Sequence, residues 1–429
     1  MAILNVSDFD AVPDGSSLST LAIQRAIDRA SAGDTVFIPA GRFLTGSLFL
    51  KSHLTLELAE GAVLLGSQQP EDYRRTETRV AGIEMPWPAG IVNINQCQEV
   101  KVTGAGTIDG QGPVWWHKFW GDDGNGGMLA QYSQKGLRWV VDYECERPRN
   151  VVVYQSEAVE LSGFTSRESG FWNIHLCYST YVSLQNVTVN NSAGPSTDGI
   201  DIDSCRHVRV EHCSVSCNDD NICVKSGRGA EAQQLAKTAS DIIIRNCELH
   251  KGSGITLGSE TSGGIERVMI EHNHFSGTGV GFRIKSSRNR GGFIRDIVVR
   301  HLTLKDVCYP FMLQLNWFPQ YSYGQQVSDD QPLHWRKLSE GVEGTAGLTR
   351  VENIMISHIT SQLTHPQRFS RAFFIEGAEE CPINQLHFSH LHLQAQEFGK
   401  IAGVNNLHFE QVMVDAPAIT QTENDTYER

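Results

Sequence analysis

The sequence has no long hydrophobic run and no excess of positive charge, and these absences exclude several classes of protein. No stretch approaches the ~18 consecutive apolar residues of a membrane span. The 429 residues carry a formal net charge of −13, whereas a nucleic-acid-binding protein normally presents a basic surface. We therefore expect neither a membrane nor a nucleic acid as a partner. The sequence makes no prediction of oligomeric state.

Residues 1–10 also lack the basic stretch and the apolar core of a secretory signal. This predicts a cytoplasmic location, where thiols stay reduced. The ten cysteines are then expected to be free, packed side chains rather than disulfides. Cys213, Cys223 and Cys247 support this, because they occupy alternating strand positions where a small hydrophobic residue would serve.

What the sequence does contain is a repeated strand pattern. An apolar-x-apolar segment, a short gap and a second apolar segment recur at positions 182, 208, 242, 268, 297, 354, 386 and 407. The shorter intervals are 21 to 29 residues, and the longer ones are explained by loop insertions. Self-similarity at such a period indicates a repeat architecture. A propeller blade would need ~40–45 residues, so each unit fits one coil of a right-handed parallel β-helix.

We predict one all-β domain over residues 1–429, with two insertions and a short N-terminal capping helix. Apolar residues at 22, 23, 26, 27 and 30 have helical spacing, and Ser17 or Ser19 is the candidate cap. The repeat lapses near 110–148 and 317–349, which predicts long loops. Residues 110–127 of the first insertion carry three tryptophans, whose rings either stack on sugars or pack the loop onto the coil.

Charged residues gather in the stretch 196–285. Asp198 and Asp219 are 21 residues apart, about one coil, so we expect them in adjacent coils with Asp220 beside Asp219. Three carboxylates on one face repel each other, and repulsion with partial burial raises at least one pKa. A carboxyl group becomes a general acid near neutral pH in this way.

Cations follow the aspartates. Arg283 and Lys285 are two residues apart on a predicted strand and therefore share a face. They either pair with the aspartates or bind a substrate carboxylate, which an arginine can hold with two hydrogen bonds. Glu260 is either a sugar or cation partner or part of a surface turn. Further cations lie nearby in the sequence and favour an acidic ligand: Lys225, Arg228, Lys251, Arg288 and Arg290.

Two groups of histidines and cysteines carry less information. The spacing of Cys205, His207, His212, Cys213 and Cys217 fits no closed zinc pattern, and strand geometry alternates their faces. We therefore predict no metal site there. Histidines also recur in one slot of the repeat, where stacking or a turn explains them better than catalysis: His212, His272, His301, His358 and His390.

The order of four motifs resembles the polygalacturonase-type glycoside hydrolases, family 28. The motifs are Thr-Asp-Gly-Ile-Asp at 197–201, Asp-Asp at 219–220, Gly-x-Gly-Ile-x-Leu-Gly-Ser at 252–259 and Arg-Ile-Lys at 283–285. The segment 109–116, Asp-Gly-Gln-Gly-Pro-Val-Trp-Trp, adds to the resemblance. It implies a right-handed parallel β-helix, hydrolysis with inversion, and no cofactor or metal.

The resemblance also implies roles for individual residues. Asp219 would protonate the glycosidic oxygen, and Asp198 and Asp220 would activate the attacking water. Arg283 and Lys285 would hold a galacturonate carboxylate. Inversion would separate the acid from the base by ~6.5–9.5 Å.

Ser253 stands where polygalacturonases have the histidine of Gly-His-Gly. Together with the segments 258–264 and 288–292, this favours the exo-acting or rhamnogalacturonan-related branch of the family. We expect an acidic, galacturonate-containing oligosaccharide as the substrate, with Ser253, Lys225 and Glu260 as further binding residues. The alternatives are a β-helical lyase, which would need a basic residue and usually calcium, and a noncatalytic carbohydrate-binding β-helix.

Overall fold

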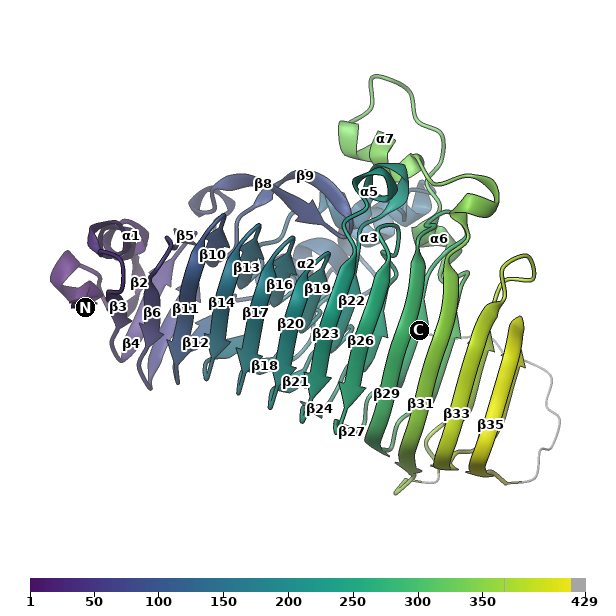
Figure 1. Ribbon diagram of the computed structural model, residues 1–429. Helices are drawn as coiled ribbons and strands as arrows, with labels where there is room; N and C mark the ends of the chain where they lie inside the picture. Colours follow the sequence, from purple (N-terminus) through teal and green to yellow (C-terminus); the bar gives the residue numbers. More distant parts are fainter. Residues whose placement is uncertain (366, 418–429) are drawn as a thin grey trace.

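The computed structural model describes residues 1–365 and 367–417. Its strands stack side by side from the N-terminus to the last strand (Figure 1), and nearly all of them are parallel. The predicted right-handed parallel β-helix is confirmed. The coils build two long sheets of 22 and 11 strands, called sheet A and sheet B. Within the described ranges, no helix is both long enough and apolar enough to cross a membrane.

Sheet A contains the repeated segments recognised in the sequence. Its strands are β1 (Ile3–Asn5), β2 (Asp14–Leu18), β3 (Thr35–Ile38), β4 (Gly41–Thr45), β6 (Thr55–Leu58), β7 (Ala62–Gly66), β11 (Gln98–Gly104), β12 (Thr107–Asp109), β14 (Glu157–Ser162), β15 (Thr165–Arg167), β17 (Thr180–Gln185), β18 (Thr188–Asn190), β20 (Arg206–Glu211), β21 (Ser214–Ser216), β23 (Ala239–Arg245), β24 (Glu248–Leu249), β26 (Ile265–Glu271), β27 (His274–Ser276), β29 (Phe293–Lys305), β31 (Arg350–Gln362), β33 (Ile383–Gln394) and β35 (Val404–Asp415).

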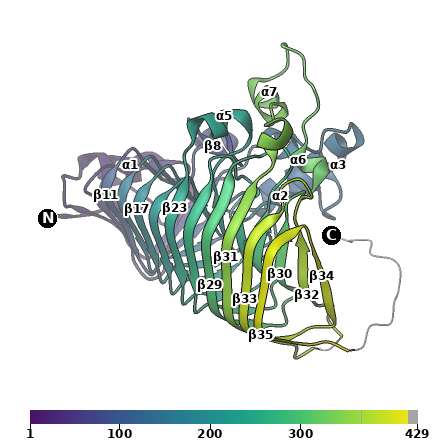
Figure 2. The same ribbon diagram turned by 45° about the vertical axis from the view of Figure 1, so that its right-hand side comes forward.

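Sheet B lies on the other side of the coil, and its last strands come forward in Figure 2. Its strands are β5 (Leu48–Phe49), β10 (Val92–Asn95), β13 (Val151–Tyr154), β16 (Ile174–Cys177), β19 (Ile200–Asp203), β22 (Ile222–Lys225), β25 (Ile255–Leu257), β28 (Val280–Lys285), β30 (Tyr309–Gln314), β32 (Arg371–Glu376) and β34 (Glu397–Ala402).

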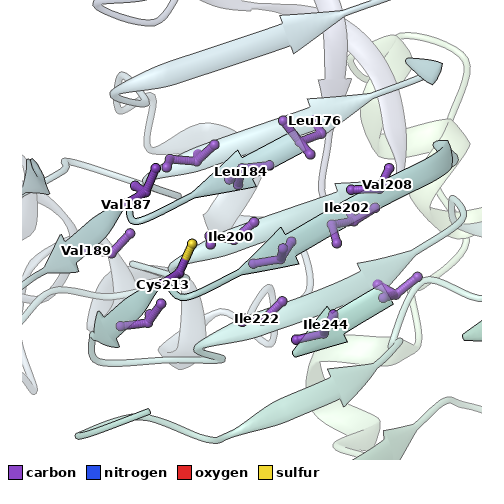
Figure 3. Packing of buried hydrophobic residues seen from close by; sticks show 14 of the residues in the cluster. Leu176, Leu184, Val187, Val189, Ile200, Ile202, Val208, Cys213, Ile222 and Ile244 are labelled. Carbon is purple, nitrogen blue, oxygen red and sulfur yellow. The ribbon is translucent and has the colours of Figure 1, made fainter. Parts of the chain in front are cut away.

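The core lies between the two sheets and is built by stacking equivalent positions of successive coils. Val208 of β20 pairs with Ile242 of β23, which pairs with Val268 of β26. Because side chains alternate along a strand, every second residue points inward. Figure 3 shows Leu184, Ile202 and their neighbours meeting in this interior. All ten cysteines are free, and eight of them are buried, as predicted.

The recurrent histidines form a ladder on the surface of sheet A. His272, His301, His358 and His390 have φ between 52° and 55°, in the left-handed region. Their ring centroids stack 4.7–4.8 Å apart. The predicted stacking is confirmed for these four residues. The coil that follows His212 places Asn246 at the equivalent bend, also with a positive φ.

A short helix covers the N-terminal end, as expected. Helix α1 (Thr20–Arg29) begins directly after Ser19 and buries Ala22, Ile23, Ala26 and Ile27. Ser19 does not cap the helix through its side chain. Its hydroxyl instead accepts a hydrogen bond from the backbone N–H of Val12, at 3.0 Å.

Both predicted insertions are present, but they contain helices. The first holds α2 (Pro113–Trp120), α3 (Gly127–Gln134) and α4 (Val141–Glu144), and the second holds α6 (Pro319–Ser322) and α7 (Leu333–Ser339). The sequence analysis missed two more. These are the antiparallel hairpin of β8 (Arg75–Val80) and β9 (Ile83–Pro88), and helix α5 (Gly229–Leu235). Short 3-10 turns are η1 (Val6–Phe9), η2 (Pro70–Asp72) and η3 (Gly344–Gly347).

The insertions pack together on one side of the coil, as α5, α7 and β8–β9 do in Figure 1. They share a second apolar core, which we call the insertion core. Its buried members are Val80, Ala81, Ile83, Met85, Trp87, Trp139, Val140, Tyr143, Phe171, Trp172, Tyr321 and Leu338. Of the tryptophans in the first insertion, Trp115 and Trp116 are buried in the main core. Packing, rather than sugar stacking, explains these two rings.

The stacked core predicts different costs for neighbouring residues of β23. Ile244 points into the core, whereas Ile243 is only partly buried on the outer face. We expect Ile244→Ala to lower the free energy of unfolding by about 2–5 kcal/mol, because it leaves a cavity. Ile243→Ala is the matched control and should cost clearly less. Urea unfolding of both variants tests this, and equal losses would contradict the assigned strand faces.

Candidate active site

Neighbouring strands of sheet B bring the predicted site residues together. Asp198 lies two residues before β19, and Asp219 and Asp220 immediately precede Asn221 and β22. Arg283 and Lys285 belong to β28, on the face opposite the core. The strands β19, β22, β25 and β28 are consecutive neighbours in the sheet. All five side chains are therefore carried by one continuous surface.

The aspartate trio (Asp198, Asp219 and Asp220) is compact. One carboxylate oxygen from each residue lies within 4.8 Å of the other two. Ile200 pairs with Ile222, so the register places Asp198 level with Asp220 rather than with Asp219. The oxygen separation is shorter than the ~6.5–9.5 Å between carboxyl groups expected for an inverting pair. An oxygen separation of this size fits a single water molecule that is hydrogen-bonded to two of the carboxylates at ~2.8 Å each.

Asp220 is buried and surrounded by donors. The Lys285 ammonium lies 2.7 Å from Oδ2, and the Thr256 hydroxyl donates to Oδ1 at 2.7 Å. The Arg283 guanidinium is farther away, with Nη1 at 3.7 Å from Oδ1. Nε of Arg283 is shielded from solvent and has no hydrogen-bond partner in the part of the chain that the structure describes. Lys285 is thus committed to Asp220, whereas Arg283 keeps a donor for a ligand.

The two adjacent aspartates have opposite pKa shifts. Burial acts to raise the pKa of Asp220, but Lys285 and Arg283 outweigh it and hold that pKa below its usual value. Burial and the neighbouring Asp220 charge raise the pKa of Asp219. The ionised form of Asp220 is therefore favoured, and Asp219 keeps its proton to a higher pH than an isolated carboxyl group would. Pairs of carboxyl groups with separated pKa values are the usual basis of acid and base roles.

A further acidic residue, Asp201, lies beside Asp198 of the trio. Burial raises the pKa of Asp198 well above its ordinary value, and Asp219 and Asp201 add to the shift. Burial also raises the pKa of Asp201 to about 8. The Cys223 thiol donates to Oδ1 of Asp201 at 2.9 Å. The sequence analysis missed Asp201 and Cys223 as site residues, although β19 alternates Ile-Asp-Ile-Asp and places its aspartates outward.

Lys225 and Glu260 form a buried ion pair below the trio. The Lys225 ammonium lies 3.0 Å from Glu260, 3.9 Å from Asp198 and 4.0 Å from Asp201. Burial acts against ionisation of Glu260, but Lys225 and Arg290 lower its pKa to about 2. Glu260 is therefore not in an exposed surface turn. Glu260 is therefore a cation partner: it pairs with Lys225, whose ammonium also lies within 4.0 Å of Asp198 and Asp201.

Ser253 lies in the turn before β25 and is partly exposed. Its backbone N–H donates to the carbonyl of Asp219 at 2.8 Å, which ties the two turns together. His250, a neighbour in sequence, is exposed on the surface. The direct role of Ser253 toward a substrate stays a prediction, as do those of Lys225 and Glu260.

Two tryptophans border the charged residues. The Lys285 ammonium lies 4.6 Å from the ring centroid of Trp317, and the Arg283 guanidinium lies 5.7 Å from it. On the other side, Lys225 lies 5.2 Å from the ring of Trp172. Cations over aromatic faces are stabilised by the ring quadrupole. Trp172 was missed because it lies outside both predicted insertions.

Buried arginines fasten the insertions over sheet B. Arg79 of the β8–β9 hairpin donates to Asp203 at 3.0 Å and to Ser204 at 2.8 Å. Arg228 donates to the backbone carbonyls of Tyr321 and Ser322 in the second insertion, at 3.1 and 3.2 Å. Each guanidinium therefore joins a coil to a segment far away in the sequence.

The cations grouped by sequence do not form one anion-binding surface. Arg228 and Arg290 are buried, and Arg290 donates to the carbonyls of Ser259 and Ser322. Lys251 is exposed and donates to the carbonyl of Ser192. Arg228, Arg290 and Lys251 are therefore engaged in hydrogen bonds within the protein, and the expectation that these cations favour an acidic ligand stays a prediction.

The oxygens of the trio lie close enough together to raise the question of a bound cation. Calcium takes six to eight oxygen ligands, and here the ammonium groups of Lys285 and Lys225 already lie against these carboxylates. The arrangement favours acid–base chemistry over calcium-dependent elimination. The Cys and His residues between 205 and 217 do not converge: Cys205 and Cys213 are buried in the core, and His207 stacks on Tyr181.

Comparisons with known proteins agree with this geometry. The model of the family described as glycosyl hydrolases family 28 matches residues 36–331, which include every predicted site residue. A second model, for rhamnogalacturonase A/epimerase, pectate lyase-like, matches residues 3–67. The match to the first model covers well over half of the chain.

Individual relatives carry related names. A Vitis vinifera protein named "Probable polygalacturonase" is 34% identical over 327 residues, covering 72% of this chain and 62% of the relative. The exo-poly-alpha-D-galacturonosidase of Dickeya chrysanthemi is 27% identical over 335 residues, covering 71% of this chain and 55% of the relative. The aligned part thus spans only about three fifths of the length of these two relatives.

Among solved structures, the exopolygalacturonase of Thermotoga maritima aligns with a TM-score of 0.77 at 25% identity, covering 95% of this chain and 91% of the other. The family 28 exopolygalacturonase of Yersinia enterocolitica aligns with a TM-score of 0.75 at 24% identity, covering 97% and 79%. The latter likeness concerns the fold alone. With a family model matched across all of the site residues and a relative above 30% identity, the chain belongs to glycosyl hydrolases family 28.

Proposed function

We propose that the protein is an inverting glycoside hydrolase that cleaves α-galacturonosyl linkages of pectin-derived oligosaccharides from a chain end, in galacturonan or rhamnogalacturonan. The observation that carries the proposal is the aspartate trio, in which the pKa of Asp219 is raised and that of Asp220 is lowered. Its position beside Arg283, within a family 28 chain, supports a uronic-acid substrate.

The trio supplies an acid and a base for one displacement. Asp219 donates its proton to the glycosidic oxygen as the bond from that oxygen to the anomeric carbon breaks. Asp220 accepts a proton from a water that attacks the anomeric carbon from the opposite face, and Asp198 helps to hold that water. The oxygen separation of at most 4.8 Å is compatible with a water bound directly between two carboxylates. Attack opposite to the leaving group inverts the anomeric configuration.

Arg283 and Trp317 are suited to hold the sugar. The guanidinium presents an unused Nε beside Asp220, and an arginine binds a carboxylate through parallel hydrogen bonds. The ring of Trp317 lies next to both Arg283 and Lys285. A galacturonate carboxylate placed against Arg283 would bring its anomeric carbon toward the trio. A neutral sugar would leave this buried guanidinium unpaired, which costs binding energy.

Action from a chain end is supported by the insertion core. Trp172 belongs to that core and also borders Lys225 below the trio. Three insertions therefore meet next to Lys225, namely the β8–β9 hairpin, residues 139–143 and residues 321–338. We expect them to restrict how far a polymer can extend in that direction. Ser253 adds to the argument, since a serine hydroxyl cannot carry the positive charge of the imidazole found in polygalacturonases.

The identity of the first product tests the proposal. The protein is incubated with homogalacturonan and rhamnogalacturonan oligosaccharides, and the first product and its anomer are followed by NMR. We expect free galacturonic acid that appears first as the β-anomer. Asp219→Asn keeps the size of the side chain but removes the proton, and should lower turnover by about 10²–10⁴-fold. Internal cleavage, an α-anomer, or an unsaturated product that absorbs in the ultraviolet would each contradict part of the proposal.

The opposite pKa shifts also predict a bell-shaped pH profile of kcat/KM. Because the pKa of Asp220 is lowered, activity is lost only as the pH falls through that low value. Because the pKa of Asp219 is raised, activity persists until the pH rises through that higher value. Lys285→Met removes the cation that holds the pKa of Asp220 down, so the acid limb should move to higher pH.

The matched control for that variant is Lys251→Met, which removes an exposed ammonium bonded to the carbonyl of Ser192. We expect its profile to match that of the parent protein. An acid limb that stays in place in Lys285→Met would show that Asp220 is not the group titrating there. Both limbs of the pH profile report the titration of the interacting trio as a whole. The quantity to compare between the variants is therefore the direction in which the acid limb moves.

A further inference from the structure

The last two strands of sheet A carry two imidazoles and a carboxylate on one face. His387 of β33 pairs directly with His408 of β35. Glu410 follows two residues after His408 and therefore points to the same side. The two ring centroids lie 4.5 Å apart and the rings are nearly perpendicular, at 87°. This group lies on the outer face of sheet A, whereas the aspartate trio lies on sheet B.

The three side chains converge without completing each other's hydrogen bonds. Nε2 of His387 is shielded from solvent and has no hydrogen-bond partner among the described residues. The nearest carboxylate oxygen, of Glu410, is 3.8 Å away, beyond hydrogen-bonding distance. One ligand atom from each of the three residues lies within 4.8 Å of the other two. A shielded nitrogen without a partner calls for an explanation, and a bound ion supplies one.

The donor set selects a class of ion. Imidazole nitrogens suit zinc, copper and nickel, whereas calcium and magnesium prefer an all-oxygen shell. Two histidines and one glutamate form a known zinc ligand set, in which a water occupies the fourth position. The side chains of His387 and Glu410 are 35% and 53% exposed. They are therefore free to rotate by the small amount needed to reach ~2.0–2.2 Å from a common centre.

We propose that His387, His408 and Glu410 form a surface site for a divalent transition-metal ion of the zinc class. The ion joins β35 to β33, the strand with which it pairs in the described part of sheet A. The ion thus holds the last described strand of sheet A against its neighbour from the outer face of the coil. Because the ion binds the folded strands and not the separated ones, its binding stabilises the native state. Hydrolysis plays no part in this site.

Zinc titration of the full-length protein, prepared without a polyhistidine tag and stripped of metal with a chelator, tests the proposal. We expect saturable binding of one zinc ion per chain by calorimetry, and an unfolding midpoint that rises with zinc concentration. His408→Ala should lower the affinity at least tenfold. Glu410→Gln should lower it less, because both imidazoles remain.

The matched control is His358→Ala, which removes an exposed imidazole of β31 that belongs to the histidine ladder. It should leave the affinity unchanged. The proposal is wrong if the parent protein shows no saturable binding, if His387→Ala with His408→Ala keeps the parent affinity, or if His358→Ala weakens binding as much as His408→Ala. Glu410→Gln provides a second test should His408→Ala destabilise the last strand, since it alters no ring contact.

Discussion

The register between parallel strands of successive coils is the constraint on which this structure depends. Backbone hydrogen bonds hold each coil against the next, so that residues more than twenty positions apart in sequence become direct neighbours. The same register stacks isoleucines and valines inside and aligns charged residues outside. Asp198 and Asp220 meet because Ile200 and Ile222 are paired beneath them. The site is thus a consequence of the strand pairing rather than of a separate local fold.

Such close placement of carboxylates is stable only because charges balance across the sheet. Lys285 neutralises Asp220 directly, and Lys225 lies between Glu260, Asp198 and Asp201. Removing a partner from a buried ion pair is costly, because it leaves an uncompensated charge. Lys285 also keeps the protonation states of Asp219 and Asp220 apart, since its ammonium lies against the Asp220 carboxylate. Stability and acid–base chemistry therefore use the same contacts.

The sequence was sufficient to predict the coil and the trio, since both follow from a regular period. It was not sufficient for the insertions. The β8–β9 hairpin and α5 carry no repeat, and the apolar residues of the hairpin pack with residues of 139–143 and 321–338, far away in the sequence. The burial of Glu260 depends on its ion pair with Lys225 in a different coil. The burial of Arg228 and Arg290 depends on hydrogen bonds to the backbone carbonyls of residues 321–322. Long-range side-chain contacts of this kind produce no periodic pattern in the sequence.

The histidine ladder of sheet A has a further consequence, because its rings lie close enough together for a charge on one to act on the next. A proton taken up by one imidazole places a positive charge less than 5 Å from the next ring. Burial, followed by the charges of His272 and His358, lowers the pKa of His301 accordingly. His301 therefore holds a proton less readily than an isolated imidazole does. The ladder thus links the protonation of His301 to the stacking of successive coils.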